Sequence, residues 1–153
     1  MNIWNRPDRI SEIYGTLIAI GLAVYFVVMY ALGLGHIIEL RLFNLFILLA
    51  GVYYALKQYK RTHEGHLNYF RGLAVGVAAS SIGVSTFAFV LFLFLKIDSD
   101  LMRTIIGNEP MGHYLNPYIA AAAIMIEGVM SGFFVTFVLL NWIYTDRVSD
   151  PIG

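Results

Sequence analysis

The chain has 153 residues, of which 59% are hydrophobic and 13% are charged, and its mean hydropathy is +0.71. About a quarter of the residues in a soluble domain are charged, so this composition is typical of an integral membrane protein. Ten basic residues balance ten acidic ones and there is no cysteine. These counts disfavour nucleic-acid binding and exclude disulfides, thiolate metal sites and thiol catalysis.

Each of four apolar segments is long enough to cross a membrane, because about 20 helical residues span a hydrocarbon core of about 30 Å. The first segment is too long for a signal peptide, whose apolar region has about 7 to 15 residues, so we expect it to be retained. We predict an all-α integral membrane protein with a single membrane domain over residues 1–153. It is a four-transmembrane-helix bundle with spans near residues 13–34, 37–57, 71–95 and 119–141.

The second span is the shortest, because only 15 uncharged residues separate Arg41 from Lys57. A full span here requires the side chains of Glu39 and Arg41 to reach the membrane interface. A re-entrant hairpin is the alternative. The connection before this span, Gly33 to His36, is short, so we expect the first two spans to form an antiparallel hairpin.

The basic residues of the loops predict the orientation, because they are enriched on the cytoplasmic side. Three lie on one side of the predicted bundle and seven on the other, so we expect both termini to be cytoplasmic. The larger group includes a basic loop that we expect to face anionic lipid headgroups, made of Lys57, Lys60, Arg61 and Arg71.

The longest connection, Lys96 to Tyr118, lies on the outer side in this topology. It contains four apolar residues that share one face at helical spacing. We predict a short amphipathic helix with Ser99 or Asp100 as its N-cap and Gly107 as its stop. We expect it to pack on the bundle as a lid, with docking to lipid or a partner as the alternative. The apolar residues are Leu101, Met102, Ile105 and Ile106.

Small residues recur at i, i+4 spacing in the third and fourth spans, where they allow membrane helices to approach closely. The third span has Gly72, Gly76 and Ser80, and the fourth has Gly128 and Gly132. We predict that these two helices pack tightly against each other. A self-dimerising face is the alternative.

Glu127 is a lone carboxylate inside the fourth span, about 12 Å from its outer end. A charged side chain at mid-membrane depth costs roughly 2.5 to 3.5 kcal/mol, so it requires a partner or a function. We interpret it first as an interior ion pair with Arg41, or as a protonated carboxyl that orders the bundle. The alternatives are a proton or cation site and docking to a partner subunit. The candidate polar cluster is Glu127, Arg41, Asn44, Ser85, Thr86 and Tyr25.

The sequence shows no catalytic signature. His63 and His66 are three residues apart, whereas the zinc-binding His-Glu-x-x-His motif has them four apart. No span contains a histidine, which disfavours a haem with two axial histidines. An enzyme acting on lipid or quinone would need a titratable cluster at the interface. We therefore expect no catalytic residue, no metal and no cofactor.

Several short motifs occur in a recognisable order. They are Tyr14-Gly15 in the first span, the segment Glu39 to Asn44, the segment Tyr53 to Lys60, the segment Leu67 to Gly72, and Ile97-Asp98. Together they resemble the bacterial domain-of-unknown-function 4199 family of small four-span membrane proteins, over about residues 12–145. The resemblance implies this fold and the bacterial inner membrane. It implies no activity.

These observations lead to an expected function. We expect a non-catalytic accessory or scaffold subunit that packs in the bacterial inner membrane. The expected partners are the lipid bilayer and either other membrane subunits or a second copy of the chain, without nucleic acid. The alternative is a small proton- or cation-linked carrier or channel-like protein that uses Glu127.

Overall fold

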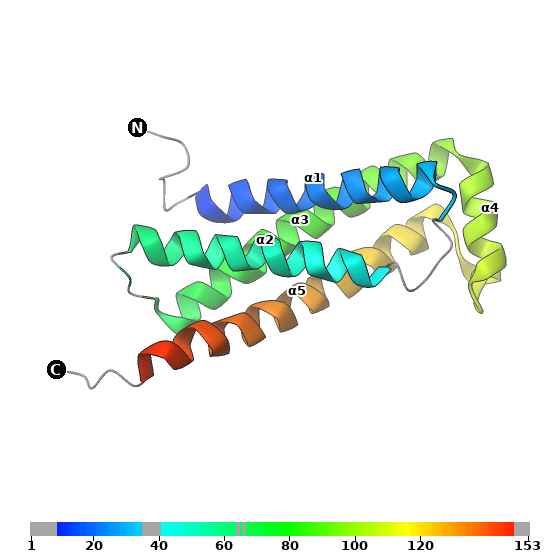
Figure 1. Cartoon of the computed structure of the whole chain (residues 1–153). Coiled ribbons are helices and arrows are strands. Elements are labelled where there is room, and N and C mark those ends of the chain that lie inside the picture. The colour runs from blue at the N-terminus through cyan, green and yellow to red at the C-terminus, as the bar shows by residue number, and fades with distance from the viewer. Residues whose placement is uncertain (1–8, 35–40, 64, 66, 149–153) are drawn as a thin grey trace.

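The computed structural model describes residues 9–34, 41–63, 65 and 67–148, and it describes the side chains as far as residue 143, except that of Arg41. Within these ranges the protein is helical, with no strand (Figure 1). The helices are α1 (Ile10–Ala31), α2 (Arg41–Thr62), α3 (Tyr69–Ile97), α4 (Ser99–Asn108), the 3₁₀ helix η4 (Gly112–Tyr114) and α5 (Pro117–Val148).

The predicted four-span helical bundle is confirmed, because α1, α2, α3 and α5 are each long and apolar enough to cross a membrane. α2 runs without interruption from Arg41 to Thr62, so the re-entrant hairpin is wrong. The predicted start of this span at residue 37 lies outside the described residues. Which side of the membrane each end faces stays a prediction from the loop charges.

Side-chain caps define where two of the spans begin. The Asn68 side chain accepts a hydrogen bond from the backbone N–H of Phe70 at 3.1 Å, and α3 starts at the next residue, Tyr69. In the same way Asn116 Oδ1 accepts from the N–H of Ile119 at 2.8 Å. α5 therefore starts at Pro117, where proline is tolerated because its missing N–H would have no helical partner.

The four spans form one bundle in which α3 is central. α3 packs against both α1 and α5, while α2 contacts α1, α3 and α5. The start of α1 and the end of α5 lie at one end of the bundle, and α4 lies across the opposite end (Figure 1). We call the end that carries α4 the capped end.

The small residues of α3 and α5 face each other, as the spacing predicts. A Cβ atom added at Gly76 would collide with Thr136, and one added at Gly132 would collide with Ser80. Gly72 meets Leu140 and Gly128 meets Val84 in the same way. These glycines are therefore used within the chain, which leaves them unavailable for a self-dimerising face.

The polar side chains in this contact bond to their own helices. Thr136 Oγ1 donates to the carbonyl oxygen of Gly132 at 2.7 Å, and Ser80 Oγ donates to that of Val77 at 3.0 Å. Both side chains are fully buried. Satisfying each hydroxyl on its own helix avoids the cost of an unpaired polar group in the core.

α4 forms the predicted lid, although its ends differ from the prediction. Its N-cap is Asp98, whose carboxylate accepts from the N–H groups of Asp100 and Leu101. Neither Ser99 nor Asp100 caps it, because Asp98 already satisfies the free N–H groups of the first turn. Gly107 lies inside the helix, which ends at Asn108. The apolar face packs on the bundle through buried Met102 and half-buried Leu101, Ile105 and Ile106.

Candidate functional site

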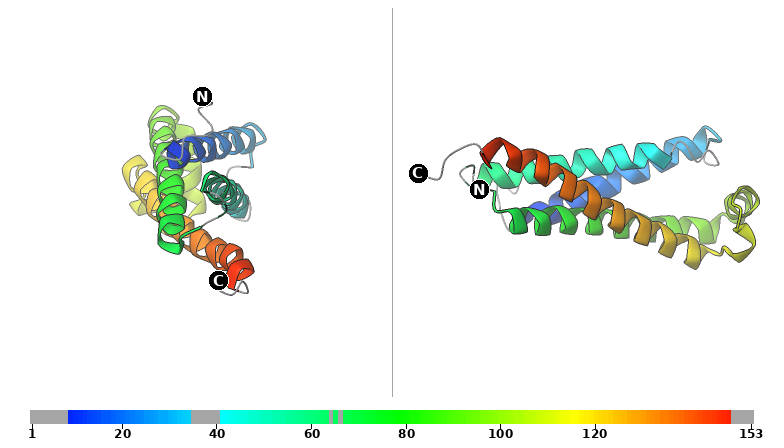
Figure 2. Two further views of the ribbon diagram at one scale, coloured as in Figure 1. Left: turned by 90° about the vertical axis from the view of Figure 1, so that its left-hand side faces the viewer. Right: turned by 90° about the horizontal axis from the view of Figure 1, so that it is seen from below.

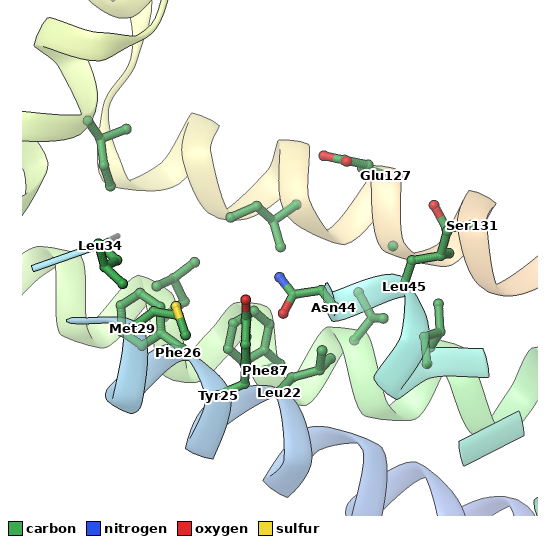
Figure 3. Close-up of a pocket in the computed structure, with 16 residues that line it drawn as sticks. Leu22, Tyr25, Phe26, Met29, Leu34, Asn44, Leu45, Phe87, Glu127 and Ser131 are labelled. Carbon is green, nitrogen blue, oxygen red and sulfur yellow. The ribbon is translucent and has the colours of Figure 1, made fainter. Parts of the chain in front are cut away.

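A cavity of about 200 Å³ lies among α1, α2, α3 and α5, towards the capped end of the bundle (Figure 3). Most of its wall is apolar, including Leu22, Phe26, Leu48, Phe87, Leu91 and Ile124, with Ile105 of α4 at one end. Tyr25, Asn44, Glu127 and Ser131 also line it. A concave, mostly apolar site with a few polar groups is the usual form of a small-molecule site.

The cavity exists because the helices separate as they approach α4. Figure 2 shows α1 and α2 diverging from α3 and α5 towards the capped end. Further from that end, α1 touches α3 closely, since a Cβ atom at Gly83 would collide with Ile18. Nearer to it, ring contacts span the wider gap, with Phe26 5.5 Å from Phe94 and 6.2 Å from Phe87 between ring centroids. Because α3 has glycine far from the capped end and phenylalanine near it, the gap between α1 and α3 widens towards that end.

Asn44 is a polar residue that points into this space. It lies in the first turn of α2, and its amide is directed into the cavity together with the ring of Tyr25 (Figure 3). Its Oδ1 atom is buried and has no hydrogen-bond partner among the described residues. Leaving a buried polar atom unsatisfied costs about 1 to 3 kcal/mol. A group that bonds to this amide therefore removes that cost.

Glu127 does not occupy the interior position that we expected. It is exposed on α5, and its carboxylate lies on the side of the helix away from Asn44 (Figure 3). It makes no hydrogen bond or ion pair with another described residue. Gly128 faces α3, and Glu127 is one residue earlier, about 100° around the helix. The predicted partner group, the side chain of Arg41, lies outside the described residues.

The structure brings only part of the predicted cluster to the cavity. Tyr25, Asn44 and Glu127 line it, whereas Ser85 and Thr86 are exposed on other faces of α3. On α3 the cavity is lined by Val84, Phe87 and Leu91. Because a helix turns about 100° per residue, Ser85 and Thr86 point in other directions.

Ser131 lines the cavity but is missing from the predicted cluster. Its position four residues after Glu127, on the same stripe of the helix, is the signal that would have found it.

The basic loop residues lie at the end of the bundle opposite α4. Lys57, Arg61 and Arg71 are exposed and Lys60 is half-buried, so this end presents positive charge. His63 stacks on Tyr59 with ring centroids 4.1 Å apart. Its predicted neighbour His66 lies outside the described residues. Among the described residues, no group of three potential metal ligands converges.

Comparison with known proteins gives one match. The family model for a protein of unknown function, DUF4199, matches residues 13–139. No curated protein and no solved structure matches the chain. The match covers most of the four-span bundle, including all residues that line the cavity. The chain therefore belongs to the DUF4199 family.

Proposed function

We propose that this protein is a non-catalytic accessory subunit of the bacterial inner membrane, and that α5 binds a transmembrane helix of a partner protein. The observation that carries the proposal is the exposed position of Glu127 within a membrane span. A carboxylate that faces lipid at this depth costs several kcal/mol, and pairing with another group lowers that cost.

The binding surface, here called the Glu127 face, consists of Ile126, Glu127, Met130 and Phe134. The three apolar residues are 62%, 64% and 68% exposed, respectively. Their exposure alone indicates no partner, because lipid tails solvate apolar side chains as well as a protein does. The carboxylate is different, since lipid tails offer it no hydrogen bond.

The charge of Glu127 selects the kind of partner. A second copy docking through the same face would bring two carboxylates together, which disfavours ionisation of both. A helix with an Arg or Lys at this depth would neutralise the charge and donate hydrogen bonds. We therefore infer a heteromeric contact with a basic transmembrane helix.

Site-specific photocrosslinking in native membranes tests this proposal. A crosslinker at Phe134, on the Glu127 face, should label a transmembrane peptide that contains a basic residue. A crosslinker at Val90, an exposed position on α3, should label only lipid. Glu127→Leu should abolish the protein crosslink, and Glu127→Gln should weaken it. Crosslinks to a second copy, or crosslinks unaffected by Glu127→Leu, would overturn the proposal.

A second candidate function is a proton- or cation-linked carrier. It is favoured by one observation, that Glu127 borders the same cavity as Tyr25, Asn44 and Ser131. Purified protein in proteoliposomes should then show a proton or cation flux that Glu127→Gln removes. The matched control is Ser85→Ala, an exposed position outside the cavity. Flux equal to that of empty liposomes would reject this candidate.

A further inference from the structure

We propose that the cavity is a binding site for a neutral, lipid-soluble compound with a ring and a hydroxyl group, and that this hydroxyl bonds to the amide of Asn44. The inference is separate from helix docking, because it concerns the space between the helices and not the exposed Glu127 face of α5. It rests on the unpartnered amide, the wall of the cavity and its volume.

The unpartnered amide of Asn44 is the reason for a hydroxyl group on the ligand. Its Oδ1 is buried without a partner, so it requires a donor. The oxygen and nitrogen of an amide are hard to tell apart, and exchanging them would leave a buried donor in need of an acceptor. A hydroxyl both donates and accepts, so it satisfies Asn44 in either orientation. A ketone or an ether accepts only.

The aromatic lining and the volume of the cavity are the reasons for a ring in the ligand. Phe26 and Phe87 line the cavity from α1 and α3 and offer aromatic faces and edges. A dry apolar cavity of about 150 Å³ holds one benzene molecule. The volume here, about 200 Å³, therefore fits one ring with a short substituent. Met29 also lines the cavity, and its flexible thioether adapts to ligands of varied shape.

The neutral charge follows from the polar groups at the rim. Among the described residues, Glu127 is the charged one that borders the cavity, and its negative charge disfavours an anionic ligand nearby. A cation would have to leave water and place its charge between leucine and phenylalanine side chains, which is costly.

Fluorine NMR of the purified full chain in detergent micelles tests the proposal. The probes are 4-(trifluoromethyl)phenol and its methyl ether, 4-(trifluoromethyl)anisole, which have the same ring but differ in the donor. Empty micelles correct for partitioning. The phenol should show saturable line broadening, and the ether should bind about tenfold more weakly, the effect of losing one hydrogen bond.

Two variants assign the binding to the cavity. Asn44→Leu should weaken the phenol about tenfold and leave the ether unchanged, while Ser85→Leu on the exposed face of α3 should change neither. Ser131→Phe should fill the cavity and block both probes, which keeps the test available if Asn44→Leu does not fold. Equal affinity for phenol and ether, unchanged binding in Asn44→Leu, or broadening that never saturates would each overturn the proposal.

Discussion

The hydroxyl of Tyr30 donates a hydrogen bond to the carboxylate of Asp98 and so joins the end of α1 to the start of α4. The same carboxylate accepts hydrogen bonds from the backbone N–H groups of Asp100 and Leu101, each at 3.1 Å. One side chain therefore caps α4 and fixes it to a span that is 68 residues away in the sequence. Since α4 supplies Ile105 to the cavity wall, this link positions part of the candidate site.

Removing the Tyr30 hydroxyl should loosen the lid. In Tyr30→Phe the ring contact with Phe94, at 5.2 Å between centroids, can persist while the bond to Asp98 is lost. We expect faster amide hydrogen exchange in α4, because the helix loses its attachment to α1 while the spans are unaffected. Tyr118→Phe is the matched control, as it removes an exposed hydroxyl from α5 at the same end. Equal exchange in the two variants would contradict this role for Tyr30.

The lid should also respond to acid. The hydrogen bond from Tyr30, and then the N–H of Leu101, lower the pKa of Asp98 below its ordinary value. A carboxyl with a lowered folded-state pKa stabilises the fold above its unfolded pKa, and this stability is lost as the pH falls through the folded value. Protection of the α4 amides, corrected for intrinsic exchange, should therefore decrease below about pH 4.

Asp98→Asn tests the origin of this acid sensitivity. It keeps a side-chain oxygen for capping but removes the titrating group. Its α4 protection should be lower at neutral pH and should no longer change over the acidic range. A decrease that persists in Asp98→Asn would assign the titration to another group.

Sequence reasoning predicted the bundle and the contact between α3 and α5 for a physical reason. Span length follows directly from the thickness of the bilayer. Glycines at i, i+4 spacing mark where membrane helices touch, and Gly76 and Gly132 do face α5 and α3. The amphipathic pattern of α4 was equally informative, because one of its faces is in water and the other is on the core.

The rotation of each span about its axis was harder to predict. A helix in lipid is apolar on its outer and inner faces alike, so the hydrophobic pattern does not show which face points into the bundle. The apolar pattern alone therefore places Glu127 in the interior, although Gly128 and Gly132 mark the face of α5 that contacts α3. Ser85 lies about 180° from Gly76 on α3 for the same reason. Aligning each span on its glycines would have placed both residues outside the interior.

The ligand-free protein should become more stable when Asn44 is replaced by Leu. The change removes a buried oxygen that has no partner and fills similar space with an apolar side chain, so we expect a gain of about 1 to 3 kcal/mol. Unfolding of the purified protein in mixed micelles measures it. Ser85→Leu, on the exposed face of α3, should change the unfolding free energy much less. Lower stability in Asn44→Leu would mean that the amide has a polar partner within the protein.

Replacing a glycine by alanine should destabilise the protein where the glycine allows two helices to touch, and not where it has no neighbour. In Gly76→Ala the new Cβ atom would collide with Thr136, which is fully buried and whose hydroxyl is held by Gly132. Thr136 is β-branched and cannot turn aside without losing that bond. We expect a loss of about 1 to 3 kcal/mol in the unfolding free energy, typical of overpacking.

Gly107 provides the matched control, because it lies inside α4 and an added Cβ atom there would have no neighbour within 4 Å. Gly107→Ala should stabilise α4 by about 0.5 to 1 kcal/mol, since alanine restricts the unfolded chain more than glycine does. Hydrogen exchange of α4 measures this gain, and unfolding in mixed micelles compares the two variants. If helix propensity alone governed these positions, both alanine variants would be more stable than the parent protein. Opposite signs would instead show that close approach of α3 and α5 is the reason for glycine at position 76.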